Sequence, residues 1–127
     1  MSKHVLVIED EPVIRALISA SLAGSCEVDS VADGQGALDS VARRLPDLIL
    51  LDVGLPGMNG TEVLRRLRAD KTTADIPVVM LTGLEPPADV EPDAVLLKPF
   101  TPSSLRESVA GWLYASAEHR QLTETSS

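Results

Sequence analysis

Short apolar segments alternate with segments of helical periodicity along most of the chain. The apolar segments have the length of β-strands, and the one at 47–52 is apolar almost throughout, as in strands buried on both faces of a sheet. The segment at 26–31 alternates loosely between apolar and polar residues, which is typical of an edge strand. The sequence therefore predicts five strands, at residues 4–8, 26–31, 47–52, 76–81 and 94–97.

Four segments between or after these strands show the apolar spacing of amphipathic helices. The first begins at Pro12, and the last begins at Thr101 and Pro102, an N-cap followed by a proline in the first turn. The second helix follows a turn at Asp33, and the third follows a loop at 53–60. The apolar positions of the four helices are Val13, Ile14, Leu17, Ile18 and Leu22; Ala37, Leu38, Val41, Ala42 and Leu45; Val63, Leu64 and Leu67; and Leu105, Val109, Trp112 and Leu113.

Strands that alternate with helices form βαβ units, which build a parallel sheet with helices on both faces. The predicted fold class is therefore α/β, a doubly wound sheet with right-handed crossovers. The last crossover is unusual, because residues 83–93 contain Pro86, Pro87 and Pro92 and leave room for about one helical turn at most. We therefore expect a degenerate or missing fourth helix between the fourth and fifth strands.

Composition narrows the function classes. The 127 residues suit a single domain, and their net charge of −8 opposes binding to nucleic acid or to anionic lipid. The three aromatic residues are too few for a base-stacking surface. No apolar segment approaches the roughly 20 residues that span a membrane, and no secretory leader opens the chain. We therefore expect a cytoplasmic protein with no direct nucleic-acid or membrane partner.

Chemically distinctive residues stand at the carboxyl ends of four predicted strands. Ligands of open α/β sheets bind beyond this edge. In chain order, these residues are Glu9 and Asp10, Asp52, Thr82 and Lys98. We therefore expect three carboxylates, a hydroxyl and an ammonium group to converge at one edge of the sheet.

This set of groups suits Mg²⁺ and a phosphoryl group. Clustered carboxylates repel one another unless a cation joins them, and Mg²⁺ binds carboxylates, waters and a backbone carbonyl, for which Gly54 is the candidate. The ammonium of Lys98 and the hydroxyl of Thr82 suit phosphoryl oxygens. A carboxylate among these groups can act as a nucleophile and form an aspartyl phosphate, and Asp52 is the central candidate.

Each of these residues has a simpler interpretation when it is taken alone. The acidic residues 9–11 could cap the helix that follows, Asp52 could be a turn residue, and Lys98 could be a surface lysine. Their joint occurrence at four strand ends favours a site. The remaining candidates are weaker: His4 and His119 are interpreted as surface residues and Cys26 as a small, partly buried hydrophobe.

The arginines of the second and third helices are interpreted as solvated side chains. No glycine-rich phosphate loop occurs in the chain, and the acidic turn after the first strand opposes a nucleotide or flavin phosphate. The common cofactor-binding proteins of this architecture are therefore excluded.

Four segments together resemble the receiver domain of two-component response regulators. The resemblance covers residues 4 to about 117 and rests on the segments 7–11, 50–60, 79–83 and 97–100. It implies a flavodoxin-like fold with strand order 2-1-3-4-5. It also implies a receiver domain at 1–117, followed by a polar tail at 118–127.

The resemblance implies a phosphoacceptor role for Asp52, which would take a phosphoryl group from a phosphohistidine. The donor would be a histidine kinase or a histidine phosphotransfer protein. Mg²⁺ would be bound by Asp52, by Asp10 directly, by Glu9 largely through water, and by the carbonyl of Gly54. The expected activity is that of a signalling domain rather than of an enzyme with external substrates.

The same resemblance implies that Thr82 and Lys98 bind the phosphoryl group and that the Lys98–Pro99 peptide bond is cis. One departure from the family lies in the fifth strand, where Val95 stands at the position of the usual Tyr or Phe. A second departure is the short last crossover. The usual output mechanism, in which that aromatic side chain swings inward, is therefore not expected.

Two alternatives of other classes stay open at the level of sequence. A pseudo-receiver would bind partners without phosphorylation, although it would typically lack Asp52, Thr82 or Lys98. An aspartyl-nucleophile phosphatase would need an acid two residues after Asp52, and Gly54 stands there.

Overall fold

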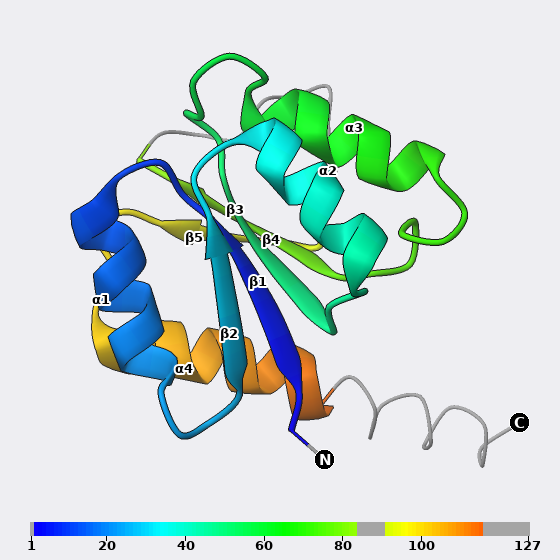
Figure 1. Cartoon of the computed structure of the whole chain (residues 1–127). Helices are drawn as coiled ribbons and strands as arrows, with labels where there is room; N and C mark the ends of the chain where they lie inside the picture. The colour runs from blue at the N-terminus through cyan, green and yellow to red at the C-terminus, as the bar shows by residue number, and fades with distance from the viewer. Residues whose placement is uncertain (1, 84–90, 116–127) are drawn as a thin grey trace, which may run out of the picture.

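The computed structural model describes residues 2–83 and 91–115, which form a parallel sheet with helices on both faces (Figure 1). The strands are β1 (His4–Ile8), β2 (Glu27–Val31), β3 (Leu48–Asp52), β4 (Val78–Thr82) and β5 (Ala94–Leu97). The helices are α1 (Pro12–Leu22), α2 (Gly34–Arg43), α3 (Gly60–Ala69) and α4 (Pro102–Ala110), and α4 continues into a π-helical turn, η1 (Gly111–Ala115).

The sheet confirms the predicted fold class. Its strands are all parallel and lie in the order β2-β1-β3-β4-β5. Helices α1 and α4 cover one face, and α2 and α3 cover the other (Figure 1). Each crossover therefore places a strand's carboxyl end at the same edge of the sheet.

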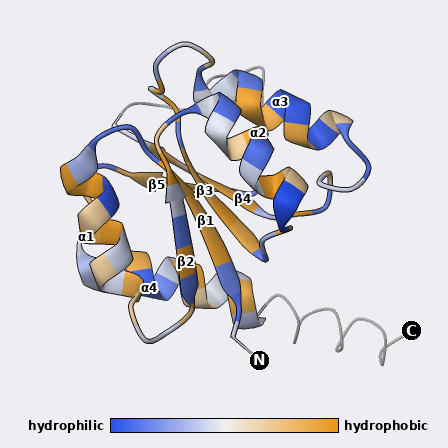
Figure 2. Ribbon diagram, viewed as in Figure 1, coloured by the Kyte–Doolittle hydropathy of each residue, from blue (hydrophilic) through white to orange (hydrophobic). Residues whose placement is uncertain are grey.

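The apolar sequence of the central strands creates two cores. Strands β1, β3 and β4 are buried along their whole length, and Figure 2 shows their hydrophobic colour between the helical layers. Alternate side chains of each strand enter opposite cores. One core, beneath α2 and α3, contains Leu6 and Ile49, and the other, beneath α1 and α4, contains Val7 and Leu50. Strand β2 is mostly polar and partly exposed, as predicted for an edge strand.

Side-chain caps fix where three of the helices begin. Asp33 accepts a hydrogen bond from the amide of Gly36, and Asn59 accepts one from the amide of Glu62, at 2.7 and 3.0 Å. The predicted cap at Thr101 forms a reciprocal capping box with Ser104. Helix α1 differs, because Glu11 occupies its N-cap position without a side-chain hydrogen bond. Capping by the Glu11 side chain therefore does not explain the acidic turn before α1.

A glycine brings α3 against the end of β3. The amide of Gly60 donates to the carbonyl of Val53 at 3.0 Å. A Cβ atom at position 60 would lie 2.3 Å from the carbonyl oxygen of Asp52, which is a backbone atom that cannot move aside cheaply. The absence of a side chain at position 60 thus allows α3 to begin directly behind Asp52.

Some apolar positions predicted to share the inner face of a helix are exposed. Val13 and Leu17 of α1 are 75% and 40% exposed, and Leu45 lies beyond the end of α2 and is 54% exposed. The inner face of α1 is formed instead by Ile18 and Leu22, which are fully buried. In α4, the predicted inward positions Leu105 and Val109 are buried.

The interpretation of His4 as a surface residue is wrong. His4 is 3% exposed, and its Nε2 lies 2.6 Å from Oδ2 of Asp29 on the neighbouring strand. Its backbone amide donates to Asp47 at 2.8 Å. The whole of β1 is buried, and the neighbouring strand β2 supplies a carboxylate partner for the buried imidazole. The interpretation of the helix arginines as solvated side chains is also wrong for Arg68, which donates to Asp93 and to two backbone carbonyls.

Three predictions lie outside the described residues. Most of the short crossover, at 84–90, cannot be compared with the expected loop or single turn. The same holds for the tail at 118–127 and for His119 within it. In the parts of the chain that the structure does describe, no helix is long and apolar enough to span a membrane.

The pairing of His4 gives a prediction for stability. Replacing Asp29 by Ala leaves the buried Nε2 of His4 without its partner, and we expect the free energy of unfolding to fall by about 1–2 kcal/mol. The matched control is Asp39→Ala, because within residues 2–83 and 91–115 its carboxylate bonds an exposed glutamine of its own helix. Urea denaturation of both variants measures the difference, and an equal loss in the two would contradict the account of His4.

Candidate functional site

The five residues singled out at the strand ends lie at one edge of the sheet. Asp52 and Thr82 are the last residues of β3 and β4, Glu9 and Asp10 follow β1, and Lys98 follows β5. Backbone hydrogen bonds join these ends: the amide of Glu9 donates to Val31, that of Val53 to Leu81, and that of Lys98 to Thr82 at 2.8 Å. The ladder of the sheet itself therefore holds the functional positions in register.

Three carboxylates form a compact cluster. Glu9, Asp10 and Asp52 each offer an oxygen within 4.8 Å of the others. Glu9 and Asp52 are buried, whereas Asp10 is exposed and faces the solvent side of the cluster. Two carboxylates about 4 Å apart repel by about 4 kcal/mol at the dielectric of a protein surface, so this arrangement needs a positive partner.

Lys98 supplies positive charge to this cluster. Its Nζ lies 2.8 Å from Oε1 of Glu9 and 3.2 Å from Oδ1 of Asp52. The peptide bond between Lys98 and Pro99 is cis, which confirms that expectation. The lysine thus bridges the carboxylates that end β1 and β3, although it follows the strand at the far edge of the sheet.

The two buried carboxyl groups of the cluster, Glu9 and Asp52, have pKa values shifted in opposite directions. The pKa of Glu9 is raised to about 7, because burial, the largest cause, and a hydrogen bond with Asp52 both raise it and outweigh the opposite effect of Lys98. Burial also acts to raise the pKa of Asp52, but hydrogen bonds with Glu9 and with the Gly54 amide, together with Lys98, lower it overall. At neutral pH Asp52 is therefore ionised, while Glu9 is partly protonated.

The same balance keeps Lys98 charged. Burial acts to lower the pKa of its ammonium group, but the hydrogen bond with Glu9 and the charge of Asp52 prevail and raise the pKa above its usual value. An ionised carboxylate therefore stands beside a permanent cation.

Similarity to known proteins shows the family to which the chain belongs. A family model described as the response regulator receiver domain matches residues 5–110. The chain belongs to this family. Its sheet order and the residues at the strand ends are those that the resemblance implies for a receiver domain.

Curated relatives are similar over most of the chain. The response regulator PleD of Caulobacter vibrioides is 48% identical over 86 residues, which cover 67% of this chain and 19% of PleD. The DNA-binding response regulator MtrA of Mycolicibacterium smegmatis is 38% identical over 112 residues, which cover 83% of this chain and 48% of MtrA. This receiver chain thus spans about a fifth of one relative and about half of the other.

Solved structures agree in fold over nearly the whole chain. The chemotaxis response regulator CheY4 of Vibrio cholerae superposes with a TM-score of 0.82 at 30% identity, covering 89% of this chain and all of that one. The receiver domain of the sensor histidine kinase PA1611 from Pseudomonas aeruginosa PAO1 gives the same TM-score and identity, covering 89% of this chain and 98% of that one. That second structure has a magnesium ion coordinated in its active-site cleft.

The acidic cluster of this receiver fits a hard cation. Oε2 of Glu9 is buried and accepts no hydrogen bond from any described residue. An unpartnered buried oxygen beside two further carboxylates is the donor chemistry that Mg²⁺ uses, and the exposed side of Asp10 leaves an entry path. Glu9, Asp10 and Asp52 are therefore the described residues best suited to hold the ion.

Two other predicted site residues, Gly54 and Thr82, lie next to the cluster or on the neighbouring strand. Gly54 is exposed and its amide donates to Oδ1 of Asp52 at 3.2 Å, so it adjoins the cluster, and the role of its carbonyl as a ligand stays a prediction. Thr82 is 6% exposed at the end of β4, next to the strand that carries Asp52. Its role toward a phosphoryl group also stays a prediction.

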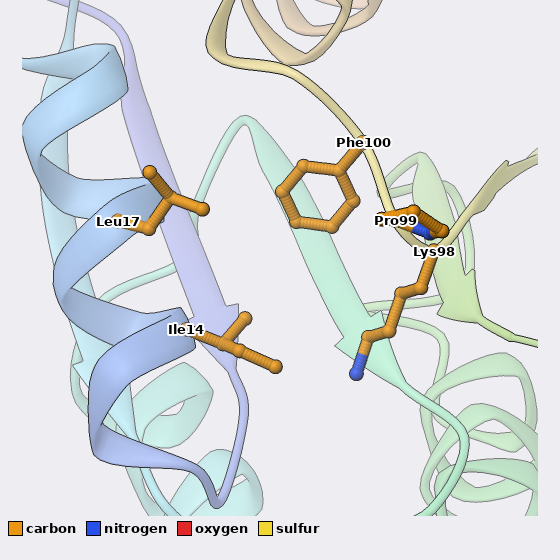
Figure 3. A pocket seen from close by; sticks show the side chains of 5 residues that line it. All are labelled: Ile14, Leu17, Lys98, Pro99 and Phe100. Carbon is orange, nitrogen blue, oxygen red and sulfur yellow. The ribbon is translucent and has the colours of Figure 1, made fainter.

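An apolar pocket adjoins the site. It has a volume of about 310 Å³ and lies between α1 and the segment after β5, lined by Ile14, Leu17, Lys98, Pro99 and Phe100. In Figure 3 the ring of Phe100 and the side chains of Ile14 and Leu17 face one another across it, and Lys98 extends past its mouth. The site therefore has a charged cluster at its centre and an apolar surface at its border.

Sequence reasoning missed Arg15, which lies in α1. Its Nη1 donates to the backbone carbonyls of Glu9 and Asp10. Arg15 stands five residues after Asp10, and nothing in the sequence indicates that its side chain folds back toward the acidic turn.

The protonation of Glu9 gives a prediction for metal binding. Glu9 must lose its proton to bind a cation, so Mg²⁺ affinity should rise with pH and level off above the pKa of about 7. We expect about a tenfold fall in the dissociation constant between pH 6 and pH 8. Titration calorimetry at several pH values measures it, with Glu9→Gln as the control that should bind weakly and without this pH dependence. An unchanged slope in that variant would contradict the assignment.

Proposed function

We propose that this receiver accepts a phosphoryl group on Asp52 in a two-component phosphorelay. The observation that carries the proposal is the pairing of an ionised, buried Asp52 carboxylate with Lys98 at 3.2 Å, beside two further carboxylates. Such a carboxylate is a nucleophile in the company of cations that neutralise phosphoryl oxygens. The donor is a phosphohistidine on a histidine kinase or on a histidine phosphotransfer protein.

The proposed transfer uses Asp52 as the nucleophile. A carboxylate oxygen of Asp52 attacks the phosphorus, the phosphorus–nitrogen bond of the phosphohistidine breaks, and its electron pair returns to the imidazole nitrogen, which takes up a proton. The product is an acyl phosphate on Asp52. The low pKa of Asp52 keeps the attacking carboxylate ionised at neutral pH.

The neighbouring side chains stabilise the transferred group. Because Nζ of Lys98 already lies within hydrogen-bond distance of Asp52, a phosphoryl group bonded there falls within reach of the ammonium. The Thr82 hydroxyl, on the adjoining strand, is assigned to another phosphoryl oxygen. Glu9, Asp10, Asp52 and the Gly54 carbonyl would hold Mg²⁺, which would supply positive charge against the phosphoryl oxygens.

The apolar pocket beside Lys98 is the surface that we assign to the donor protein. A histidine side chain must approach Asp52 past the border of the site, and the pocket supplies apolar contact area there. Leu17 and Val13 of α1 extend this surface with exposed apolar side chains. The charge of −8 and the proposed role suit a cytoplasmic protein partner rather than nucleic acid.

The output face of this receiver is proposed to be non-standard. Val95 of β5 is 36% exposed and carries no aromatic ring that could turn inward when Thr82 moves. Leu97, on the same strand, is 59% exposed. Signalling therefore proceeds through protein contacts that do not use the aromatic switch. A pseudo-receiver without phosphorylation is the alternative, kept open by this departure.

The assignment of Asp52 gives a direct prediction. Incubation with Mg²⁺ and acetyl phosphate should add one phosphoryl group to the wild-type chain and none to Asp52→Asn, as measured by intact mass. Asp39→Asn is the control, because it removes an exposed carboxylate of α2 that is not part of the acidic cluster and should be labelled like the wild type. Labelling of Asp52→Asn would overturn the phosphoacceptor, and a folded wild type that stays unlabelled would favour the pseudo-receiver.

If the apolar pocket binds the donor protein, a substitution in it should affect transfer from a histidine kinase but not labelling by a small phosphodonor. Leu17→Asp should leave labelling by phosphoramidate unchanged, because the small donor needs no apolar surface. The same variant should lose at least about tenfold in the rate of transfer from a histidine kinase that phosphorylates the wild type. Leu45→Asp is the matched control, since Leu45 is similarly exposed at the end of α2. Equal transfer rates in both variants would place the donor elsewhere.

A further inference from the structure

The acidic turn between β1 and α1 is held by one guanidinium group. Nη1 of Arg15 donates to the carbonyl oxygen of Glu9 at 3.0 Å and to that of Asp10 at 3.2 Å. Arg15 is only partly exposed, and in the part of the chain that the structure describes these carbonyls are its side-chain partners. The arginine therefore contacts the backbone of the acidic turn and leaves the carboxylates available to a cation.

Few other contacts fix this turn. The amide of Glu9 donates to Val31 at 3.1 Å, which anchors the entry from β1. At the exit, the carbonyl of Glu11 accepts from the amide of Arg15 at 3.0 Å, but the Glu11 side chain makes no capping hydrogen bond. The two peptide planes that follow Glu9 and Asp10 are therefore oriented by the same Arg15 donor. These planes set the directions in which the two side chains leave the backbone.

The two carboxylates depend on the turn to different degrees. Glu9 is buried and its Oε1 is also held by Lys98 at 2.8 Å. Asp10 is exposed, so the direction of its carboxylate follows chiefly from the backbone. We propose that Arg15 is a positioning residue for the cation site, which orients the Glu9–Asp10 backbone so that both carboxylates face Asp52. The inference rests on the proposed function, in which these carboxylates hold Mg²⁺.

The direction in which Mg²⁺ affinity changes when Arg15 is removed distinguishes a positioning role from an effect of its charge. A guanidinium near the site repels a divalent cation, so if its charge were all that mattered, its removal would tighten Mg²⁺ binding. If Arg15 acts by orienting ligands, its removal weakens binding in spite of the relief of repulsion. Loss of an outer partner of this kind typically lowers metal affinity by about 10–100-fold.

The experiment measures Mg²⁺ binding by titration calorimetry in the full chain. Arg15→Gln removes the charge and the Nη1 donor, whereas Arg15→Lys keeps the charge but replaces the planar guanidinium by a more flexible ammonium. We expect the dissociation constant to rise about tenfold in Arg15→Gln and by a smaller factor in Arg15→Lys. Arg43→Gln is the matched control, because Arg43 is an exposed arginine of α2 whose loss changes the net charge equally.

A second readout separates positioning from folding. The rate of labelling by acetyl phosphate should fall in Arg15→Gln at low Mg²⁺ and recover toward the wild-type rate when Mg²⁺ is saturating. Thermal unfolding without Mg²⁺ checks that both variants are folded, and Arg15→Lys decides the outcome if Arg15→Gln is not. Binding that is unchanged or tighter in the folded variants overturns the inference. A wild type that binds Mg²⁺ but is not labelled refutes the proposed function, and the binding constants still decide the role of Arg15.

Discussion

Carboxylates that are forced together at the edge of a sheet repel one another, and this repulsion governs the functional end of the molecule. Glu9 and Asp52 end or follow neighbouring parallel strands, so the sheet fixes their separation. Their repulsion is relieved by Lys98, by partial protonation of Glu9 and, in the proposed function, by Mg²⁺. A site that holds unbalanced negative charge in this way is prepared to bind a cation and, through that cation and the lysine, a phosphoryl group.

Backbone contacts hold Asp52 and Lys98 at this edge of the sheet. Gly60 lets α3 begin directly against the backbone of Asp52. The backbone hydrogen bond between Lys98 and Thr82 places the lysine at the same edge. The functional residues stand at the carboxyl ends of β1, β3, β4 and β5. The position of the site in the middle of the sheet is therefore a consequence of the parallel topology.

Much of this arrangement follows from the sequence, because parallel strands end at one edge and the apolar runs reveal the strands. That logic places Asp52, Thr82 and Lys98 together from the sequence alone. It fails where a partner comes from a distant segment: buried His4 is paired with Asp29 of the neighbouring strand, and the side chain of Arg15 folds back toward the preceding loop. Leu17 has the spacing of a core residue, yet the pocket beside Phe100 leaves it exposed. Apolar periodicity indicates which face of a helix is apolar, but not which residues cover that face.

A crystal structure with Mg²⁺ and beryllofluoride, a mimic of the phosphoryl group, tests the central claim most directly. The account predicts that the cation binds to Glu9, Asp10 and Asp52, and that the mimic bonds to the Asp52 carboxylate. It further predicts that Lys98 then turns from Glu9 to a fluorine of the mimic, with the Thr82 hydroxyl on another. A structure in which Lys98 keeps both carboxylates, with no mimic on Asp52 under these conditions, would contradict the account.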